Sequence, residues 1–421
     1  MSERIVIRFQ NHGDCCQESL EAAPVDVPGP NKPEDVSIPP LTGDPRSDGK
    51  ILLELLRRQP AISQALDAVT PRDESAPIYL QLEDGGDELD ALPWEVLFHP
   101  SRKFLSLSNF WPVVRSKQIF NLRDLERDVC VRRRRTKIRL LAVLAAAGAD
   151  WRRELCSFEK ASLACSKLAC DLEVILFHSA RGPVTSAAIA PDRIRPFTSA
   201  QALWDAIAEF SPNILHFFCH GSVANGPQLH CARVLYHDQP IPENMVTISP
   251  ECLQRNLPLS QSLWMVVLNA CSTGAAAGEN QHSFARELLS PQIPLVLANR
   301  VPVEERDASI LTERLYPSLA QTVRSHARSN EAEWSGSLLS ARNALVNLPT
   351  AAQDAWSRPM LYAVPNRFRF HPVATADPED ASRRETVDSV QSHLRHVGHF
   401  PDGILGSLPP GTERLPPATS R

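Results

Sequence analysis

Six short apolar segments, separated by stretches with helical spacing, constrain this 421-residue chain more than any other feature. They are almost uninterrupted by polar residues and lie at residues 138–145, 172–177, 214–218, 263–268, 294–298 and 360–364. Strands of this kind are buried on both faces. Helices are predicted between and after them, at 151–169, 200–210, 249–256, 282–289, 304–325 and 331–347. We therefore predict an α/β fold with a mostly parallel sheet and helices on both faces.

The rest of the chain divides into three further regions. Residues 1–50 are predicted to form a strand at 5–9 and then a Pro-rich linker. Residues 51–136 form an N-terminal accessory subdomain, in which Pro60 separates two helices and residues 78–82 form a strand. The α/β core occupies 137–370. Residues 371–421 are rich in Pro, Ser and charge without periodicity, which predicts a disordered tail.

Composition excludes several functional classes. The formal net charge is -5 and 22% of the residues are charged, so nothing indicates nucleic acid as a direct partner. No apolar stretch is long enough to cross a membrane, and the N-terminus lacks the pattern of a secretory signal. These features predict a cytoplasmic protein, whose ten Cys residues are mostly reduced thiols. No C-x-x-C pair occurs, so zinc-ribbon and thioredoxin-like sites lack support.

Two of the apolar segments end in polar signatures. His220 and Gly221 follow the segment at 214–218, and Asn269 and Cys271 follow the segment at 263–268. Carboxyl ends of parallel strands meet at one edge of a sheet, where α/β proteins bind their ligands. A thiol with a pKa of about 8.5 is only slightly ionised at neutral pH. A nearby imidazole raises its thiolate fraction and can protonate a leaving amine.

Both signatures resemble those of a known peptidase family. His-Phe-Phe-Cys-His-Gly at 216–221 and Asn-Ala-Cys-Ser-Thr-Gly at 269–274 are similar to the motifs of CHAT peptidases. These are caspase-like enzymes of the clan that holds caspases, metacaspases and separases. Caspases separate His and Cys by about 50 residues, close to the 51 residues here. Further segments resemble the family in the same order, over roughly 77–365: Leu-Pro-Trp-Glu at 92–95, the strand at 293–297 with Leu315 and Tyr316, and the closing strand at 356–362.

The resemblance implies a cysteine endopeptidase that acts through a thioester acyl-enzyme. His220 would be the general base, Cys271 the nucleophile, and the backbone amides of Gly221 and Cys271 the oxyanion hole. This chemistry needs no metal and no organic cofactor. The family further implies one or a few specific protein substrates and a role in signalling or defence. No tetratricopeptide repeats, often joined to such enzymes, are found, so a sensor or activator would be a separate protein or the N-terminal region.

Substrate preference stays open at this stage. Asn269 holds a position that often lines the first specificity pocket in caspase-like enzymes, and metacaspases carry Asp there, which suits a basic substrate residue. Glu304, Glu305 and Asp307 are expected mainly to charge the first turn of the helix at 304–325. They could also line the pocket and favour Arg or Lys.

Plainer interpretations exist for each motif. Cys271 and His220 could be a buried thiol and a core imidazole. The protein would then be a catalytically silent caspase-fold scaffold that binds a protein partner. Acyl transfer to a non-peptide substrate is a further alternative. His216 and Cys219 are expected to pack in the core, and the spacing of His230, Cys231 and His237 fits no metal site. The basic run at 132–135 is expected to be a solvated segment, rather than a nucleic-acid contact or a self-processing site.

Overall fold

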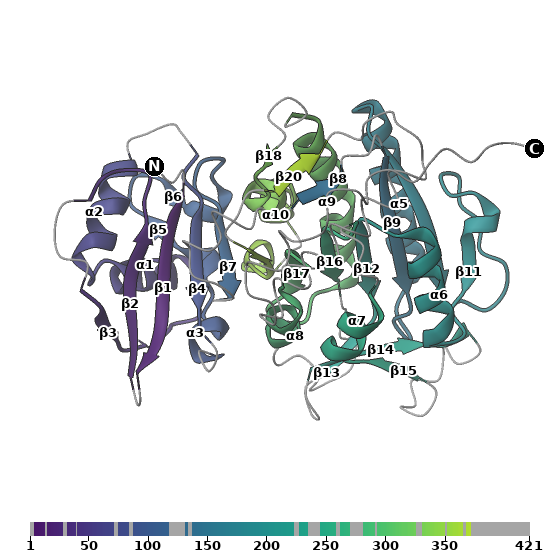
Figure 1. Cartoon of the computed structure of the whole chain (residues 1–421), viewed down its shortest axis with the longest axis horizontal. Coiled ribbons are helices and arrows are strands. Elements are labelled where there is room, and N and C mark those ends of the chain that lie inside the picture. The colour runs from purple at the N-terminus through teal and green to yellow at the C-terminus, as the bar shows by residue number, and fades with distance from the viewer. Residues whose placement is uncertain are drawn as a thin grey trace, which may run out of the picture.

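Figure 1 shows the computed structural model of the chain, in which a twelve-stranded sheet runs across the molecule. The structure describes residues 4–12, 15–27, 32–38, 40–70, 75–83, 87–117, 131–133, 137–222, 227–234, 245–257, 262–269, 281–290, 293–325, 331–349, 352–364 and 368–371. In spatial order the strands are β11 (Ile194–Pro196), β10 (Asp171–His178), β9 (Lys137–Leu144), β12 (Ile214–Phe218), β16 (Met265–Leu268), β17 (Leu295–Asn299), β19 (Pro359–Ala363), β7 (Val113–Lys117), β4 (Ile78–Leu82), β1 (Ile5–His12), β2 (Cys15–Ala22) and β3 (Glu34–Val36).

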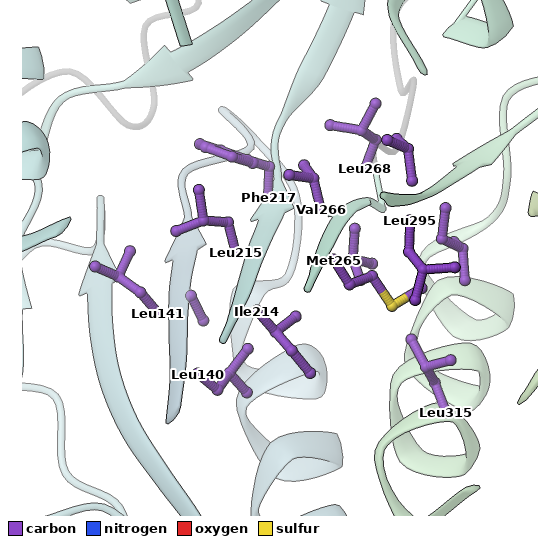
Figure 2. Close-up of a cluster of buried hydrophobic side chains, with 14 of the residues drawn as sticks. Leu140, Leu141, Ile214, Leu215, Phe217, Met265, Val266, Leu268, Leu295 and Leu315 are labelled. Carbon is purple, nitrogen blue, oxygen red and sulfur yellow. The ribbon is translucent and has the colours of Figure 1, made fainter. Parts of the chain in front are cut away.

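The predicted α/β core is confirmed. β10, β9, β12, β16 and β17 pair in parallel, and β19 closes this half of the sheet in the antiparallel sense. Each of the six apolar segments forms a strand, and Figure 2 shows apolar side chains of β9, β12, β16 and β17 side by side. Their burial on both faces explains why the segments lack polar alternation.

Helices cover both faces of this half. The chain steps from β9 to β10 through α5 (Trp151–Lys167), then steps back to β12 through α6 (Ala200–Phe210). It continues in that second direction through α7 (Pro250–Asn256) and α8 (Gln281–Leu288). Because such crossovers are right-handed, α5 lies on one face, and α6, α7 and α8 lie on the other. α9 (Glu305–Ser325) joins α5, with the Lys160 ammonium 3.0 Å from the Glu313 carboxylate.

The N-terminal region differs from its prediction. The Pro-rich stretch expected to be a linker contains β3 and the start of α1 (Pro45–Leu56), whose N-cap is Asp44, and the unpredicted strand β2 lies just before it. β1 pairs with β2 and β4, so the first strand belongs to the same sheet as the core. Pro60 begins α2 (Pro60–Val69), where a missing N–H costs nothing. The sequence did not reveal β2 because its polar residues, including Glu18, hide the strand pattern.

One other segment also differs from its prediction. The helix predicted at 331–347 is a strand, β18 (Glu331–Ala332), a 3₁₀ turn (Ser335–Leu338) and the shorter α10 (Leu339–Val346). The basic run contributes Arg132 and Arg133 to β8 (Val131–Arg133), which pairs with β20 (Phe368–His371). The predicted tail beyond His371 lies outside the described residues. None of the described helices combines the length and apolar composition that crossing a bilayer would need.

A buried ion cluster lies where the two halves of the sheet meet. β7 and β19 share one register pair, Arg115 with Tyr362. The fully buried Arg115 guanidinium donates to both oxygens of Glu95, at 3.0 and 2.7 Å, and to Asp90 Oδ1 at 3.1 Å. The Tyr362 hydroxyl donates to the same Asp90 carboxylate at 2.8 Å. Glu95 belongs to the Leu-Pro-Trp-Glu segment and lies in the 3₁₀ turn Trp94–Val96. This motif therefore stabilises the seam, the junction between β7 and β19.

Glu95 carries the charge that compensates Arg115. Burial opposes ionisation of Glu95, but the Arg115 charge and its hydrogen bonds outweigh this effect and lower the pKa of Glu95 below its ordinary value. Burial likewise opposes the charged form of Arg115, while Glu95, Tyr362 and Asp90 hold the pKa of the guanidinium above its ordinary value. The pair therefore stays ionised inside the protein, and each member depends on the other.

We expect Glu95→Ala to lower the free energy of unfolding by about 3–5 kcal/mol, because it leaves a buried guanidinium without its main counter-charge. Urea denaturation of the purified chain measures this. Glu88→Gln, an exposed carboxylate change nearby on α3 (Asp87–Ala91), is the control and should stay within about 0.5 kcal/mol of wild type. A loss below about 1 kcal/mol for Glu95→Ala would contradict this role.

A second buried carboxylate, Glu18 on β2, is compensated less fully. It is 1% exposed, and burial raises its pKa to about 7, against the opposing effects of the Gln59 backbone and Arg58. A carboxyl group whose pKa is higher in the folded state binds more protons there than in the unfolded chain. Stability therefore falls as the pH rises from the unfolded value near 4.5 through the folded value.

Glu18→Gln should remove this pH dependence. The variant is expected to melt at a higher temperature than wild type at about pH 8, and the difference should vanish by about pH 4, where wild-type Glu18 is largely protonated in both states. Melting curves across this range measure the effect. Glu54→Gln, a change at an exposed carboxylate on α1, is the control, and an equal gain at both pH values would show that ionisation is not the cause.

Candidate active site

The carboxyl ends of β12 and β16 lie side by side. The strands pair in register, with Phe217 opposite Leu268, and Phe217 also pairs with Val143 of β9. His220 comes two residues after the end of β12, and Asn269 directly follows β16. Cys271, two residues further along the sequence, lies outside the described residues. The sheet therefore brings His220 to the edge where the chain leaves β16 toward Cys271.

His220 is held by a main-chain carbonyl. Its ring Nε2 lies 2.8 Å from the carbonyl oxygen of Ala147, in the loop after β9. A carbonyl oxygen only accepts hydrogen bonds, so Nε2 carries the hydrogen, and in the neutral ring the basic lone pair is on Nδ1. A base whose second nitrogen is fixed by another group is the arrangement that nucleophilic catalysis uses. This contact fixes the tautomer and the plane of the imidazole.

Main-chain bonds hold the surrounding loops in place. The Ala145 amide donates to the Phe218 carbonyl at 2.8 Å, and the Ala232 amide donates to the Ala145 carbonyl at 2.8 Å. His220 then begins β13 (His220–Ser222), which forms a small antiparallel sheet with β14 (Gln228–Ala232) and β15 (Met245–Ile248). Gly221 is buried in β13, opposite Leu229. The sequence analysis did not predict this sheet.

His230 is the cross-strand neighbour of His220. Its Nε2 lies 2.6 Å from the Ser222 hydroxyl, and its Nδ1 lies 3.3 Å from the Thr247 hydroxyl. Burial lowers the pKa of His230, and the nearby His220 lowers it further, because two imidazolium charges would repel. Cys231 is fully buried in the core, and His237 lies outside the described residues. Among the described residues, no three His, Cys, Asp or Glu side chains are grouped as a metal site would need.

Asn269 faces the interior of this structure. It is fully buried, and its amide nitrogen donates to the Ala308 carbonyl at 3.0 Å, to Glu154 Oε1 at 3.2 Å and to the Thr312 hydroxyl at 3.2 Å. The Asn299 amide, at the end of β17, donates to Asn269 Oδ1 at 3.4 Å. The bonds of Asn269 thus join the end of β16 to α5, α9 and β17. Its predicted contact with substrate stays a prediction.

The same network includes a buried glutamate that the sequence analysis missed. Glu154 in the first turn of α5 has no solvent exposure, and Thr312 donates a short hydrogen bond to its Oε1. His216 Nε2 lies 3.2 Å from that oxygen, and His216 Nδ1 lies 2.6 Å from the Tyr316 hydroxyl. Burial and the Glu154 charge raise the pKa of Tyr316 well above its ordinary value. His216 is therefore a packed residue, as expected, and one with fixed polar partners.

A signal for Glu154 was present in the sequence. The buried face of α5 carries Phe158, Ala161 and Cys165, and Glu154 falls on that face four residues before Phe158. A charged residue within an apolar helical face indicates an internal partner. The Ala147 carbonyl had no such signal, because any residue supplies a carbonyl and only the fold aims it.

The three acidic residues after β17 occupy different environments. Asp307 is 3% exposed and lies 3.2 Å from the Arg306 guanidinium. The Glu304 side chain is largely exposed and lies 3.5 Å from the same guanidinium. Glu305 begins α9, where a carboxylate complements the helix dipole. Arg306 partly compensates this acidic charge, and a contact of the three residues with a basic substrate remains a prediction.

Comparison with known proteins identifies the family of the chain. The CHAT domain model matches residues 49–363, and the chain belongs to this family. The chain is also 25% identical over 186 residues to Protein YABBY 5 of Oryza sativa subsp. indica, covering 42% of this chain and 68% of that protein. Among solved structures it is similar to the Arg-specific cysteine proteinase gingipain R, with a TM-score of 0.41 and 11% identity over 77% of this chain and 68% of the other.

The electrostatic effect of His220 on His230 can be tested by titration. We expect the pKa of His230, followed by imidazole NMR, to rise in His220→Gln, because the variant removes a like charge. The value should stay below that of a free histidine, since burial of His230 remains. His99→Gln, in the N-terminal region on β5 (Phe98–His99), should leave it unchanged. An unchanged His230 pKa in His220→Gln would show that the rings do not interact.

Proposed function

We propose that this protein is a cysteine endopeptidase with Cys271 as nucleophile and His220 as general base. The observation that carries the proposal is the parallel register of β12 and β16, which puts His220 at the strand end leading to Cys271. Membership of the CHAT family and the contact of His220 with the Ala147 carbonyl support it.

The proposed reaction uses His220 twice. Nδ1 of His220 accepts the Cys271 thiol proton, and the thiolate attacks the carbonyl carbon of the scissile peptide bond. The tetrahedral oxyanion is stabilised by backbone amides, for which Gly221 and Cys271 are the proposed donors. Its collapse breaks the C–N bond, and the imidazolium returns the proton to the leaving amine. A water molecule, deprotonated by His220, then hydrolyses the thioester and restores the thiol.

The setting of the reaction is also part of the proposal. Family membership favours a specific protein substrate cut by limited proteolysis in a cytoplasmic signalling or defence pathway. A separate sensor or activator protein would switch the enzyme on. These statements rest on analogy with the family and not on the geometry of the site.

A mixed peptide library analysed by mass spectrometry tests the dyad. We expect wild type to cleave, and Cys271→Ala and His220→Ala to lose activity by roughly 10³-fold or more. Matched controls are Cys156→Ala, which removes an exposed cysteine, and His99→Ala, which removes a histidine in the N-terminal region. Both controls should retain wild-type cleavage. The cut sites would also define the preference of the first pocket.

Three other outcomes are informative. Cleavage that persists in Cys271→Ala would refute the assignment of the nucleophile. Absence of cleavage, with Cys271 alkylated no faster than Cys156, would favour a catalytically silent scaffold that binds a protein. Absence of cleavage with a selectively reactive Cys271 would instead indicate a competent nucleophile that needs an activator.

A further inference from the structure

One short segment contacts both His220 and Asn269, the residue that directly follows β16. The segment runs from the end of β9 into the first turn of α5, residues 145–154. Its Ala147 carbonyl fixes the His220 ring, and its Glu154 carboxylate accepts from Asn269, two residues before Cys271. Ala145 also bonds both Phe218, at the end of β12, and Ala232 of β14 through its main chain. A shift of this segment would therefore move both the proposed base, His220, and Asn269 at the end of β16.

Glu154 is the anchor on the Asn269 side. Its Oε1 accepts hydrogen bonds from the Asn269 amide and the Thr312 hydroxyl, and the His216 Nε2 atom lies 3.2 Å away. All four side chains are fully buried. Hydrogen bonds to a charged acceptor are stronger than those between neutral groups, and a buried donor that loses its partner is costly. Rotation of the Asn269 side chain away from α5 is therefore strongly disfavoured.

We propose that Glu154 is a positioning residue for the peptidase reaction, and this inference rests on the proposed function. By holding Asn269, Glu154 sets the direction in which the chain leaves β16 toward Cys271. Because Ala147 lies on the same segment, the His220 ring and the Asn269 side chain are held by one short piece of chain. Glu154 does not touch substrate in this scheme. Misplacement of reacting groups by about 1 Å can reduce rates about 10²-fold, so such an anchor affects kcat.

The test compares variants that differ in the acceptor at position 154. Glu154→Met keeps the approximate volume and removes the acceptor, and we expect kcat to fall about 10²-fold with KM changed less than about threefold. Glu154→Gln keeps an oxygen where Oε1 accepts its hydrogen bonds, so it should restore most of kcat. This restoration distinguishes an oxygen acceptor from mere filling of space. All rates are measured well below the melting temperature of each variant and normalised to folded protein.

A second pair of variants covers the possibility that Glu154→Met does not fold. Thr312→Val removes one donor to Glu154 and one acceptor for Asn269 at nearly constant volume, and kcat should fall about tenfold with little change in KM. Thr322→Val, further along α9, removes a hydroxyl that bonds to the Ser318 carbonyl and should match wild type. Wild-type kcat in folded Thr312→Val, or an equal loss in Thr322→Val, would overturn the inference.

The inference and the proposed function can fail separately. If wild type cleaves through Cys271 and the position-154 variants cleave equally well, the inference alone is wrong. If wild type does not cleave but Cys271 is selectively alkylated, the rate of that alkylation replaces kcat as the readout, with the same order among variants expected. If Cys271 is neither catalytic nor selectively reactive, the proposed function is refuted and the inference with it.

Discussion

The pairing of Arg115 with Glu95 and Asp90 is the constraint on which the joining of the two halves of the molecule depends. The sheet is continuous, but β7 and β19 share a single register pair at its middle. That pair is Arg115 with Tyr362, and both side chains bond to the Asp90 carboxylate. An ion pair without solvent is stable only if each charge keeps its partner. Side-chain hydrogen bonds and ion pairs thus stabilise the seam at the point where β7 and β19 share only one register pair.

The strands β1 and β4, on the N-terminal side of this seam, contribute side chains to two hydrophobic cores. On β1, Ile5, Ile7 and Phe9 pack in the core of the N-terminal half, while Val6 packs in the core of the α/β half. The side chains of β4 are divided between the two cores in the same way, and Tyr79 packs in the core of the α/β half. Because side chains alternate across a strand, one extended segment contributes to both faces. The N-terminal region is therefore an integral part of the sheet that supports the candidate active site.

The candidate active site depends on main-chain geometry as much as on reactive side chains. Parallel pairing aligns the ends of β12 and β16, and the chain between β9 and α5 contacts His220 beyond the first strand and Asn269 beyond the second. His220 obtains its tautomer from a carbonyl, and Asn269 obtains its orientation from a buried carboxylate. Glu154 lies in the first turn of a helix, where the dipole of the helix favours a negative charge. Local helix formation and the order of the site are thus coupled.

The sequence by itself determined the class of fold and the pair of motifs. Six apolar segments predict buried parallel strands because such strands need cover on both faces, and Leu-Pro-Trp-Glu, His220 and Cys271 are local signals. The predictions missed β2, the small sheet after β12 and the short elements at 331–338, since their patterns are polar or brief. Only the tertiary structure decided that Glu95 meets Arg115, that Ala147 meets His220 and that Glu154 meets Asn269. Those contacts join residues 20, 73 and 115 positions apart, and no local pattern records which distant groups the packing of a sheet will bring together.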